Sequence, residues 1–242
     1  MPKNLSEQLL HDLGKDIVLG IIPPGDVLPK VETLSVEKGV SRTVIREALK
    51  GLSARRLLES STKTGTIVRP KEEWLWWDPD VISWASEAED NRPFLKQLTE
   101  VRLAVEPAAV KLAAKYAEEN DKQEMKEAFR VLEQATADQK AWTEADAAFH
   151  NAMLKASHNQ LMISLVQTLH NGLMQSRETT IRILKEHQDE HGDTTTKEAL
   201  KLHEDVLKAI LEGSEEKAET AMTKLLQSVA DLIDAMNSGR VL

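Results

Sequence analysis

The segment from Leu28 to Val68 constrains the fold of this chain more than any other part of its sequence. Leu28-Pro29 leads into a short helix, VETLSVEK, which ends at Gly39. Ser41 is a favourable N-cap for a second helix, RTVIREALKGLSARR, and two helices joined by a glycine turn form a helix-turn-helix. The two β-prone runs of LLESSTKTGTIVRP flank a polar tip and predict a hairpin. The sequence therefore predicts a winged helix-turn-helix.

Charge is divided unevenly along the chain, whose net charge is -9. Residues 1–71 contain 12 Lys and Arg against 8 Asp and Glu, a net charge of +4, whereas residues 72–242 contain 19 against 32, a net charge of -13. A local cationic face is sufficient for DNA binding, because counterions released from the phosphates supply the free energy. The sequence thus predicts a basic nucleic-acid-binding module followed by an acidic one.

Beyond Glu72 the sequence pattern is almost entirely helical. The segment EEWLWWDPDVISWASE holds four of the five tryptophans, and we interpret residues 72–91 as a linker that packs against the helical part. The fold class is therefore mainly α, with a winged helix-turn-helix and small β-hairpin wing over residues 1–71 and an all-α helical bundle over residues 92–242. The helices predicted from periodicity and breaks cover residues 4–20, 78–88, 92–118, 121–137, 141–156, 159–186, 194–212 and 215–237.

The start of the second helix of the helix-turn-helix is expected to meet DNA, because this part of a recognition helix enters the major groove. The planar fork of Arg42 or Arg46 fits both O6 and N7 of guanine, while hydroxyl groups and the wing tip suit phosphates or groove edges. The alternative is that the two arginines form a solvated helix face. The predicted DNA-contacting residues are Ser41, Arg42, Thr43, Arg46, Lys63, Thr64 and Gly65.

The pattern LP(x)nGVSRTVIREALKGL…LLE…TGTIV closely resembles the winged-helix domain of the GntR family of bacterial regulators. The resemblance implies a homodimer that binds a palindromic operator, with the arginines matching Arg42 and Arg46 on the DNA. One departure is visible. Many members carry Glu-Arg shortly after the Leu-Pro, where this chain has Val31 and Glu32. We therefore expect one common family contact to be missing and the operator to differ.

A second constellation lies in the helical part. Asp146 and His150 are four residues apart in EADAAFHNAML, which places both side chains on one helix face, and His203 follows in LKLHEDVLKAI. A carboxylate and imidazoles suit a divalent metal such as Zn, Ni or Mn, or an acidic ligand held by charge-assisted hydrogen bonds. The alternative for an Asp and His one turn apart is an ordinary polar pair at the surface or in the core.

The segments WDPDVISW, VRLAVEPAAVKLAA, the D-x3-H helix and HEDVLKAI resemble the FCD effector domain of the FadR subfamily. The resemblance implies that residues 92–242 bind an effector and dimerise, and that Asp146, His150 and His203 match three of four metal ligands. The fourth position falls on Leu225. Three protein ligands remain, so the metal is bound weakly, is completed by water or effector, or is replaced by direct effector contacts.

Arg102 lies in VRLAVEP, which corresponds to the pocket-lining first helix of that domain. The resemblance therefore implies that Arg102 clamps the effector's carboxylate bidentately, beside Asp146, His150 and His203. The alternative for Arg102 is an ion pair with Glu100 or Glu106. His170 is a reserve metal ligand.

These features predict a ligand-responsive repressor. The WDPDVISW linker resembles regulators of sugar-acid catabolism, so the expected effector is an aldonate or hexuronate such as galactonate or gluconate, followed by lactate-like or dicarboxylic acids. A metal-dependent hydrolase is the alternative from another class, but no motif supplies a general base or an oxyanion stabiliser, so we expect no enzyme. A third alternative is a constitutive architectural DNA-binding protein, but the helical part and its polar residues would then have no function.

The localisation expected from the sequence is cytoplasmic. The chain has no cysteine, which agrees with a reducing compartment. It also shows no signal peptide and no run of roughly 20 apolar residues, the length that a membrane span needs.

Overall fold

The computed structural model describes residues 5–61, 64–88, 91–191 and 194–238. The chain divides into two compact units, Met1–Glu89 and Asp90–Leu242, each of which is described by itself. The first contains the small sheet, and the second contains only helices. The predicted mainly α fold, with a winged helix-turn-helix followed by an all-α bundle, is confirmed. Among the described residues, no helix combines the length and the apolar character required to cross a membrane.

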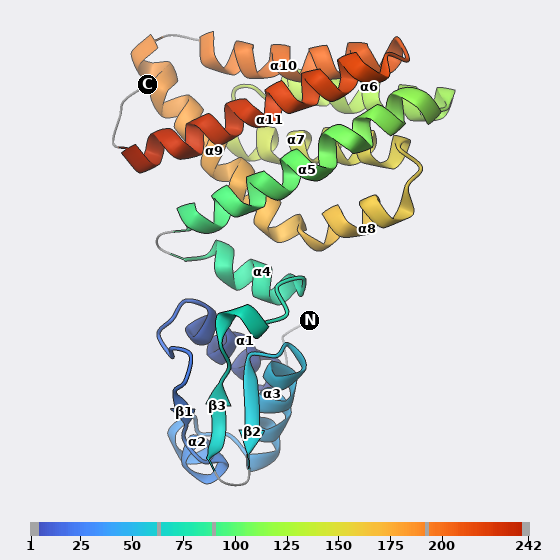
Figure 1. Ribbon diagram of the computed structural model, residues 1–242. Coiled ribbons are helices and arrows are strands. Elements are labelled where there is room, and N and C mark those ends of the chain that lie inside the picture. Colours follow the sequence, from blue (N-terminus) through green and yellow to red (C-terminus); the bar gives the residue numbers. More distant parts are fainter. Residues whose placement is uncertain (1–4, 62–63, 89–90, 192–193, 239–242) are drawn as a thin grey trace. The chain divides into compact units, whose positions relative to one another are not determined.

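The N-terminal unit is built around a helix-turn-helix and a three-stranded antiparallel sheet in the order β1-β3-β2 (Figure 1). The sequence predicted only the hairpin of β2 and β3, and it missed β1, which is two residues long and forms its ladder with the distant β3. Its elements are α1 (Leu5–Val18), β1 (Val27–Leu28), α2 (Val31–Glu37), α3 (Arg42–Ala54), β2 (Leu58–Ser61), β3 (Gly65–Val68), a 3-10 turn (Lys71–Glu73) and α4 (Pro79–Ser86).

The core of this unit follows from the periodicity of its helices. Along α1, apolar residues four positions apart, including Leu9, Leu13 and Ile17, are buried. They face α3, which buries Ile45 and Leu52 among others. Burial of one face leaves the opposite face of α3 to solvent.

Trp84 on α4 ties the segment after the wing to α1. Its side chain is 1% exposed, and its Nε1 donates a hydrogen bond of 2.8 Å to Nδ1 of His11. Arg55 holds the start of α4 through Asp78 and Asp80. Trp84 therefore packs within the N-terminal unit, and the expected packing of the linker against the helical bundle stays a prediction. The domain division at residues 71 and 91 stays a prediction.

Gly14 on α1 makes the position of Trp84 possible, because a Cβ atom at Gly14 would overlap the indole ring. We expect Gly14→Ala to destabilise the protein: overpacking costs about 1–3 kcal/mol, more than the roughly 1 kcal/mol that alanine gains over glycine in a helix. The matched control is Gly51→Ala on α3, whose Cβ would overlap the end of the Leu10 side chain, which is flexible and partly exposed and can therefore move aside. Urea unfolding followed by tryptophan fluorescence measures both, and equal midpoints for the two variants would contradict the expectation.

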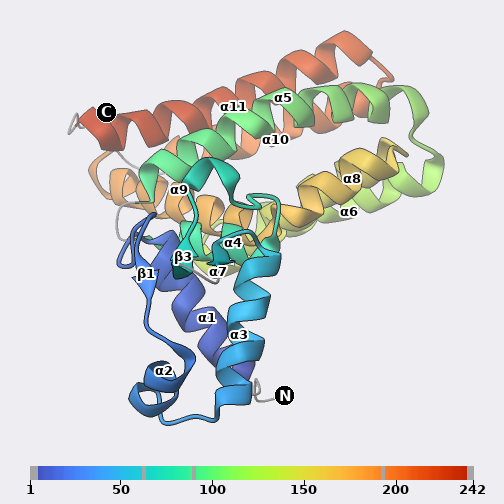
Figure 2. The ribbon, with the colours of Figure 1, turned by 60° about the horizontal axis from the view of Figure 1, so that its bottom comes forward.

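The second unit is a bundle of helices. Helices α5, α10 and α11 run side by side in both views, and α6 packs on α7 (Figure 1, Figure 2). Its core centres on large buried side chains such as Met125, Leu132, Phe149 and Met153. The helices are α5 (Arg92–Tyr116), α6 (Glu119–Gln134), α7 (Gln139–Ala156), α8 (Gln160–Thr168), α9 (His170–His191), α10 (Thr194–Leu211) and α11 (Glu215–Ser238).

Two predicted helix boundaries are wrong. The single helix expected over residues 159–186 is two helices, because α8 ends at Thr168 and α9 begins at His170. The interruption falls at Leu169, the C-cap of α8, and the run His170-Asn171-Gly172 that follows it consists of weak helix formers. The break expected over residues 187–196 is also narrower, since α9 continues to His191 and α10 begins at Thr194.

Candidate functional site

The N-terminal end of α3 presents the predicted DNA-contacting side chains to solvent. Ser41 is the N-cap, and its Oγ accepts a hydrogen bond from the Val44 backbone N–H. Arg42, Thr43 and Arg46 are exposed, as expected for the face opposite the buried one. The sequence therefore folds into a helix whose start offers two exposed arginine side chains and two hydroxyl groups.

Arg42 has an acidic neighbour on α2. Its Nη1 lies 3.8 Å from Oε1 of Glu32, and both side chains are more than half exposed. Ion pairs of this kind contribute little, so Arg42 remains available to a stronger partner such as a phosphate or a guanine. At the wing, Thr64 and Gly65 are exposed. The predicted contact Lys63 lies outside the described residues.

A cavity of about 300 Å³ lies inside the helical unit. This volume is at the lower end of the roughly 300–1,000 Å³ typical of small-molecule sites. Buried polar side chains contributed by α5, α7, α9 and α10 line one part of it: Arg102, Asp146, His150, Arg177 and His203. Apolar side chains complete the wall: Trp142, Ile181, Leu202, Leu225, Val229 and Leu232.

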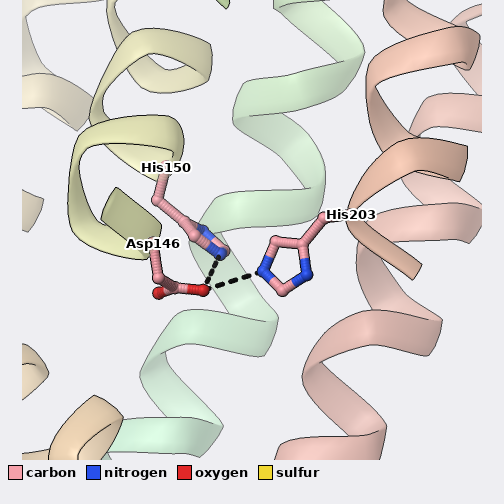
Figure 3. A group of neighbouring side chains, drawn as sticks. All are labelled: Asp146, His150 and His203. Atoms are coloured by element: carbon pink, nitrogen blue, oxygen red, sulfur yellow. Dashed lines mark hydrogen bonds and ion pairs between the residues drawn. The ribbon is translucent and has the colours of Figure 1, made fainter. Parts of the chain in front are cut away.

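Asp146 is the centre of the polar cluster, and its two carboxylate oxygens have different partners. Oδ1 lies 2.8 Å from Nε2 of His203 and 3.9 Å from Nε2 of His150. Oδ2 accepts a hydrogen bond from Nε of Arg177. Figure 3 shows Asp146 and His150 on one helix and His203 on another, with the three side chains directed toward one another. The predicted triad is therefore assembled, although its role is a separate question.

The far nitrogen of each imidazole faces a hydrogen-bond acceptor. Nδ1 of His150 lies 2.7 Å from Oε2 of Glu106, and Nδ1 of His203 lies 2.7 Å from the Ala199 carbonyl oxygen. An acceptor at this position favours a proton on each Nδ1, and each Nε2 is directed toward Asp146. A carboxylate or carbonyl behind the imidazole is the usual support of a metal-binding histidine.

The three residues fit a divalent metal. Their ligand atoms lie within 4.8 Å of one another, and all three side chains are buried. The lone pairs of His203 Nε2 and Asp146 Oδ1 would repel at 2.8 Å unless a proton or a cation lies between them. Three protein ligands with an open position also match the general pattern of metal sites that bind an exogenous ligand.

Charge in the cluster is stabilised by opposite charge. Burial raises the pKa of Glu106, but Arg102 and His150 outweigh burial and hold this pKa well below its usual range. Burial also opposes ionisation of Asp146, whose pKa is nevertheless kept well below its usual range by His150, Arg177 and His203. Burial lowers the pKa of His150, although the nearby carboxylates of Asp146 and Glu106 act to raise it. Ionised carboxylates and a neutral imidazole are the forms that bind a metal.

Arg102 lines the cavity, as predicted. It also forms an ion pair with Glu106, which the sequence analysis gave as the alternative to effector binding. Its Nε donates to Oε1 of Glu106 at 2.6 Å, and both side chains are buried. Glu106 is one helical turn away, whereas Glu100 is two residues away, on a different face of α5. The pair uses Nε, which leaves the two terminal nitrogens of the guanidinium for a ligand.

Two members of the cluster were not predicted as site residues. Glu106 appeared only as an ion-pair alternative, and Arg177 was missed. A signal for Arg177 was present, because Leu173, Arg177 and Ile181 follow one another at spacings of four and all three are buried. An arginine within an apolar helix stripe is a buried charge that needs a partner. The reserve ligand His170 is exposed and does not line the cavity.

A winged helix-turn-helix unit joined to a helical unit with a polar internal cavity defines the class of ligand-responsive DNA-binding regulators. Comparison with family models agrees: residues 5–68 match "Bacterial regulatory proteins, gntR family", and residues 97–228 match the FCD domain. The chain belongs to the GntR family of transcriptional regulators and carries an FCD domain.

Known relatives cover most of the chain. It is 34% identical over 165 residues to the galactonate operon transcriptional repressor of Escherichia coli K12, covering 68% of this chain and 72% of that protein. It is 30% identical over 214 residues to the regulator LutR of Bacillus subtilis 168, covering 88% of this chain and 94% of LutR. Among solved structures, Lar of Listeria monocytogenes has a TM-score of 0.61 at 19% identity, covering 98% of this chain and 99% of Lar, which shows a shared fold.

Proposed function

We propose that this chain represses an operon for sugar-acid catabolism and is released from DNA when a small carboxylate, an aldonate or a hexuronate, enters the cavity of the helical unit. The observation that carries the proposal is the cavity, in which two arginines and a carboxylate–imidazole cluster are gathered in a space of about 300 Å³. The similarity to a galactonate operon repressor supports the class of ligand. The galactonate operon repressor and LutR are both transcription regulators, which supports a regulator over the hydrolase alternative.

DNA binding in this proposal uses the start of α3 and the wing. The contacts are assigned to Ser41, Arg42, Thr43, Arg46, Lys63, Thr64 and Gly65. The net charge of +4 over residues 1–71 supports this surface as the one that approaches the phosphates. Because the operator lies on the chromosome, this function places the protein in the cytoplasm of a bacterium.

The proposed effector site consists of Arg102, Asp146, His150 and His203. Asp146 and the two histidines would hold a divalent metal such as Zn, Ni or Mn, which supplies a Lewis-acidic centre for an anionic ligand. Arg102 binds the effector's carboxylate through its terminal nitrogens. Leu225, at the position of a fourth ligand, lines the cavity with a side chain that cannot coordinate, so a bound metal would have three protein ligands.

A homodimer completes the proposal, since a palindromic operator requires two DNA-binding units related by a twofold axis. Helix α8 supports self-association. Five of its nine residues are apolar, none of the nine is buried within the chain, and Leu161 is 83% exposed. A second copy that covers this helix would remove the apolar surface from water.

The experiment that tests the effector is thermal melting of the full chain, with and without EDTA, in the presence of galactonate, gluconate, hexuronates, lactate or dicarboxylates. A ligand at 100 times its Kd stabilises the folded state by about 2.7 kcal/mol, which raises the Tm of a chain of this size by roughly 5–10 °C. We expect a sugar acid to give this rise and EDTA to reduce it. A protein on which no acid raises the Tm would contradict the proposal.

The matched variants for this experiment are Arg102→Lys and Arg130→Lys. Lysine at 102 keeps the charge that Glu106 needs but lacks the bidentate fork, so the rise in Tm with the sugar acid should be largely lost. Arg130 is an exposed arginine on α6 that does not line the cavity, so its replacement should leave the rise intact. Equal rises for the two variants would remove Arg102 from the effector site.

A further inference from the structure

The polar residues that line the cavity differ in exposure, and this divides the cavity into two ends. Arg102, Arg177 and the metal-site residues are buried and form the inner end. Glu198 on α10 and Asp231 on α11 also line the cavity but are exposed, so they form the outer end, where the cavity opens to solvent. A ligand inside the cavity therefore meets different chemistry at its two ends.

The inner end favours a carboxylate. Arg102 and Arg177 balance the charges of Glu106 and Asp146, with which they form ion pairs. A divalent cation at the proposed metal site then gives this end a surplus of positive charge. Guanidinium groups are preferred partners of carboxylates because of their paired N–H donors.

The wall of the cavity also offers hydrogen-bond acceptors. The hydroxyl group of Thr180 donates to the Ser176 carbonyl oxygen at 2.9 Å, and that of Ser228 donates to the Leu225 carbonyl oxygen at 2.7 Å. With their protons engaged in this way, these hydroxyl oxygens present only lone pairs to the cavity. At the outer end, Glu198 and Asp231 add two carboxylates. Hydroxyl groups of a ligand that meet these carboxylates therefore act as donors.

We propose that the cavity selects acids with one carboxylate and a hydroxylated tail, and that Glu198 and Asp231 exclude acids with a carboxylate at both ends. The inference rests on the proposed function and narrows its ligand class. A polyol tail donates its O–H groups to the acceptors of the outer end. A second carboxylate has no proton to donate and meets two charges of its own sign, which disfavours binding. Aldonates and hexuronates meet this requirement, and aldarates do not.

The test compares two acids that differ only at the far end of the chain: galactonate, which ends in a hydroxymethyl group, and galactarate, which ends in a second carboxylate. Their dissociation constants for the full-length protein are measured by titration calorimetry. We expect galactonate to bind at least about tenfold more tightly, because like charges are brought together only in the galactarate complex. The pair gluconate and glucarate gives an independent second comparison.

The variant Glu198→Gln/Asp231→Asn keeps the shape of the outer end and removes both of its charges. We expect it to narrow the ratio of the two constants to within about threefold, mainly by tighter binding of galactarate. The matched control, Glu133→Gln/Glu144→Gln, removes two exposed charges from α6 and α7 outside the cavity and should leave the ratio unchanged.

The outcomes separate this inference from the proposed function. Galactarate that binds the unaltered protein as tightly as galactonate, or more tightly, overturns the inference and leaves the sugar-acid regulator standing. If the ratio of the two dissociation constants is the same in the double variant as in the unaltered protein, Glu198 and Asp231 do not cause the selectivity, and the inference is overturned as well. If none of the four acids binds and no hexuronate raises the Tm, the proposed function fails, and the inference fails with it.

Discussion

Replacing Arg42 and Arg46 together with alanine is expected to lower operator affinity by a factor of about 100 or more. Each arginine that contacts a base or a phosphate contributes about 1–3 kcal/mol, and a tenfold change in affinity corresponds to about 1.4 kcal/mol. Both side chains are exposed at the start of α3, so their removal should not change the Tm. The same variant should therefore be folded and unable to bind its DNA.

The measurement is fluorescence anisotropy with a duplex that the unaltered protein has selected from a random pool. The single variants separate two kinds of contact. An arginine that reads a base relaxes the sequence preference when it is removed, whereas an arginine on a phosphate lowers affinity for all sequences and reduces the salt dependence. Arg130→Ala, on the acidic helical unit, is the matched control. A double variant that retains full affinity would place the DNA surface elsewhere.

The parts of the fold that sequence reasoning predicted are those with local signals. These signals extend over only a few residues of the chain. They are the N-cap Ser41, the turn at Gly39 and the apolar periodicity of α1 and α3. Strand β1 has no such signal, because two residues show no alternation and only pairing with β3 defines them. The division between α8 and α9 was missed for a related reason: Leu169 continues the apolar pattern, and the single glycine that follows it, Gly172, lies inside α9 rather than at the break.

The candidate site was partly predictable. Asp146 and His150 share a helix face by spacing alone, but only the family resemblance linked His203 to the same site, because tertiary packing brings α10 to α7. Helix geometry also favours Glu106 over Glu100 as the partner of Arg102. Arg177 belongs to no motif. Its partner, Asp146, is 31 residues away, and no local rule specifies which buried carboxylate a buried arginine meets.

Replacing Asp146 with alanine is expected to destabilise the protein by about 3–5 kcal/mol, the usual cost of breaking a buried ion pair by removing one partner. Both Arg177 and Asp146 are buried, so the guanidinium would be left without its carboxylate in a low-dielectric interior. His203 would also lose the acceptor that lies 2.8 Å from its Nε2. Urea unfolding of the full chain, followed by circular dichroism of the helices, measures the loss.

The double variant Asp146→Ala/Arg177→Met distinguishes a broken ion pair from a lost metal ligand. Removing both charges restores much of the stability, because no unpaired charge remains buried. It cannot restore a carboxylate ligand, so stabilisation by added Zn²⁺ and by the sugar acid should remain absent. Glu127→Ala, which breaks an exposed pair with Arg130, is the control and should leave the unfolding midpoint unchanged. A single variant as stable as the unaltered protein would show that Arg177 finds another partner, and a double variant that still responds to Zn²⁺ would remove Asp146 from the metal site.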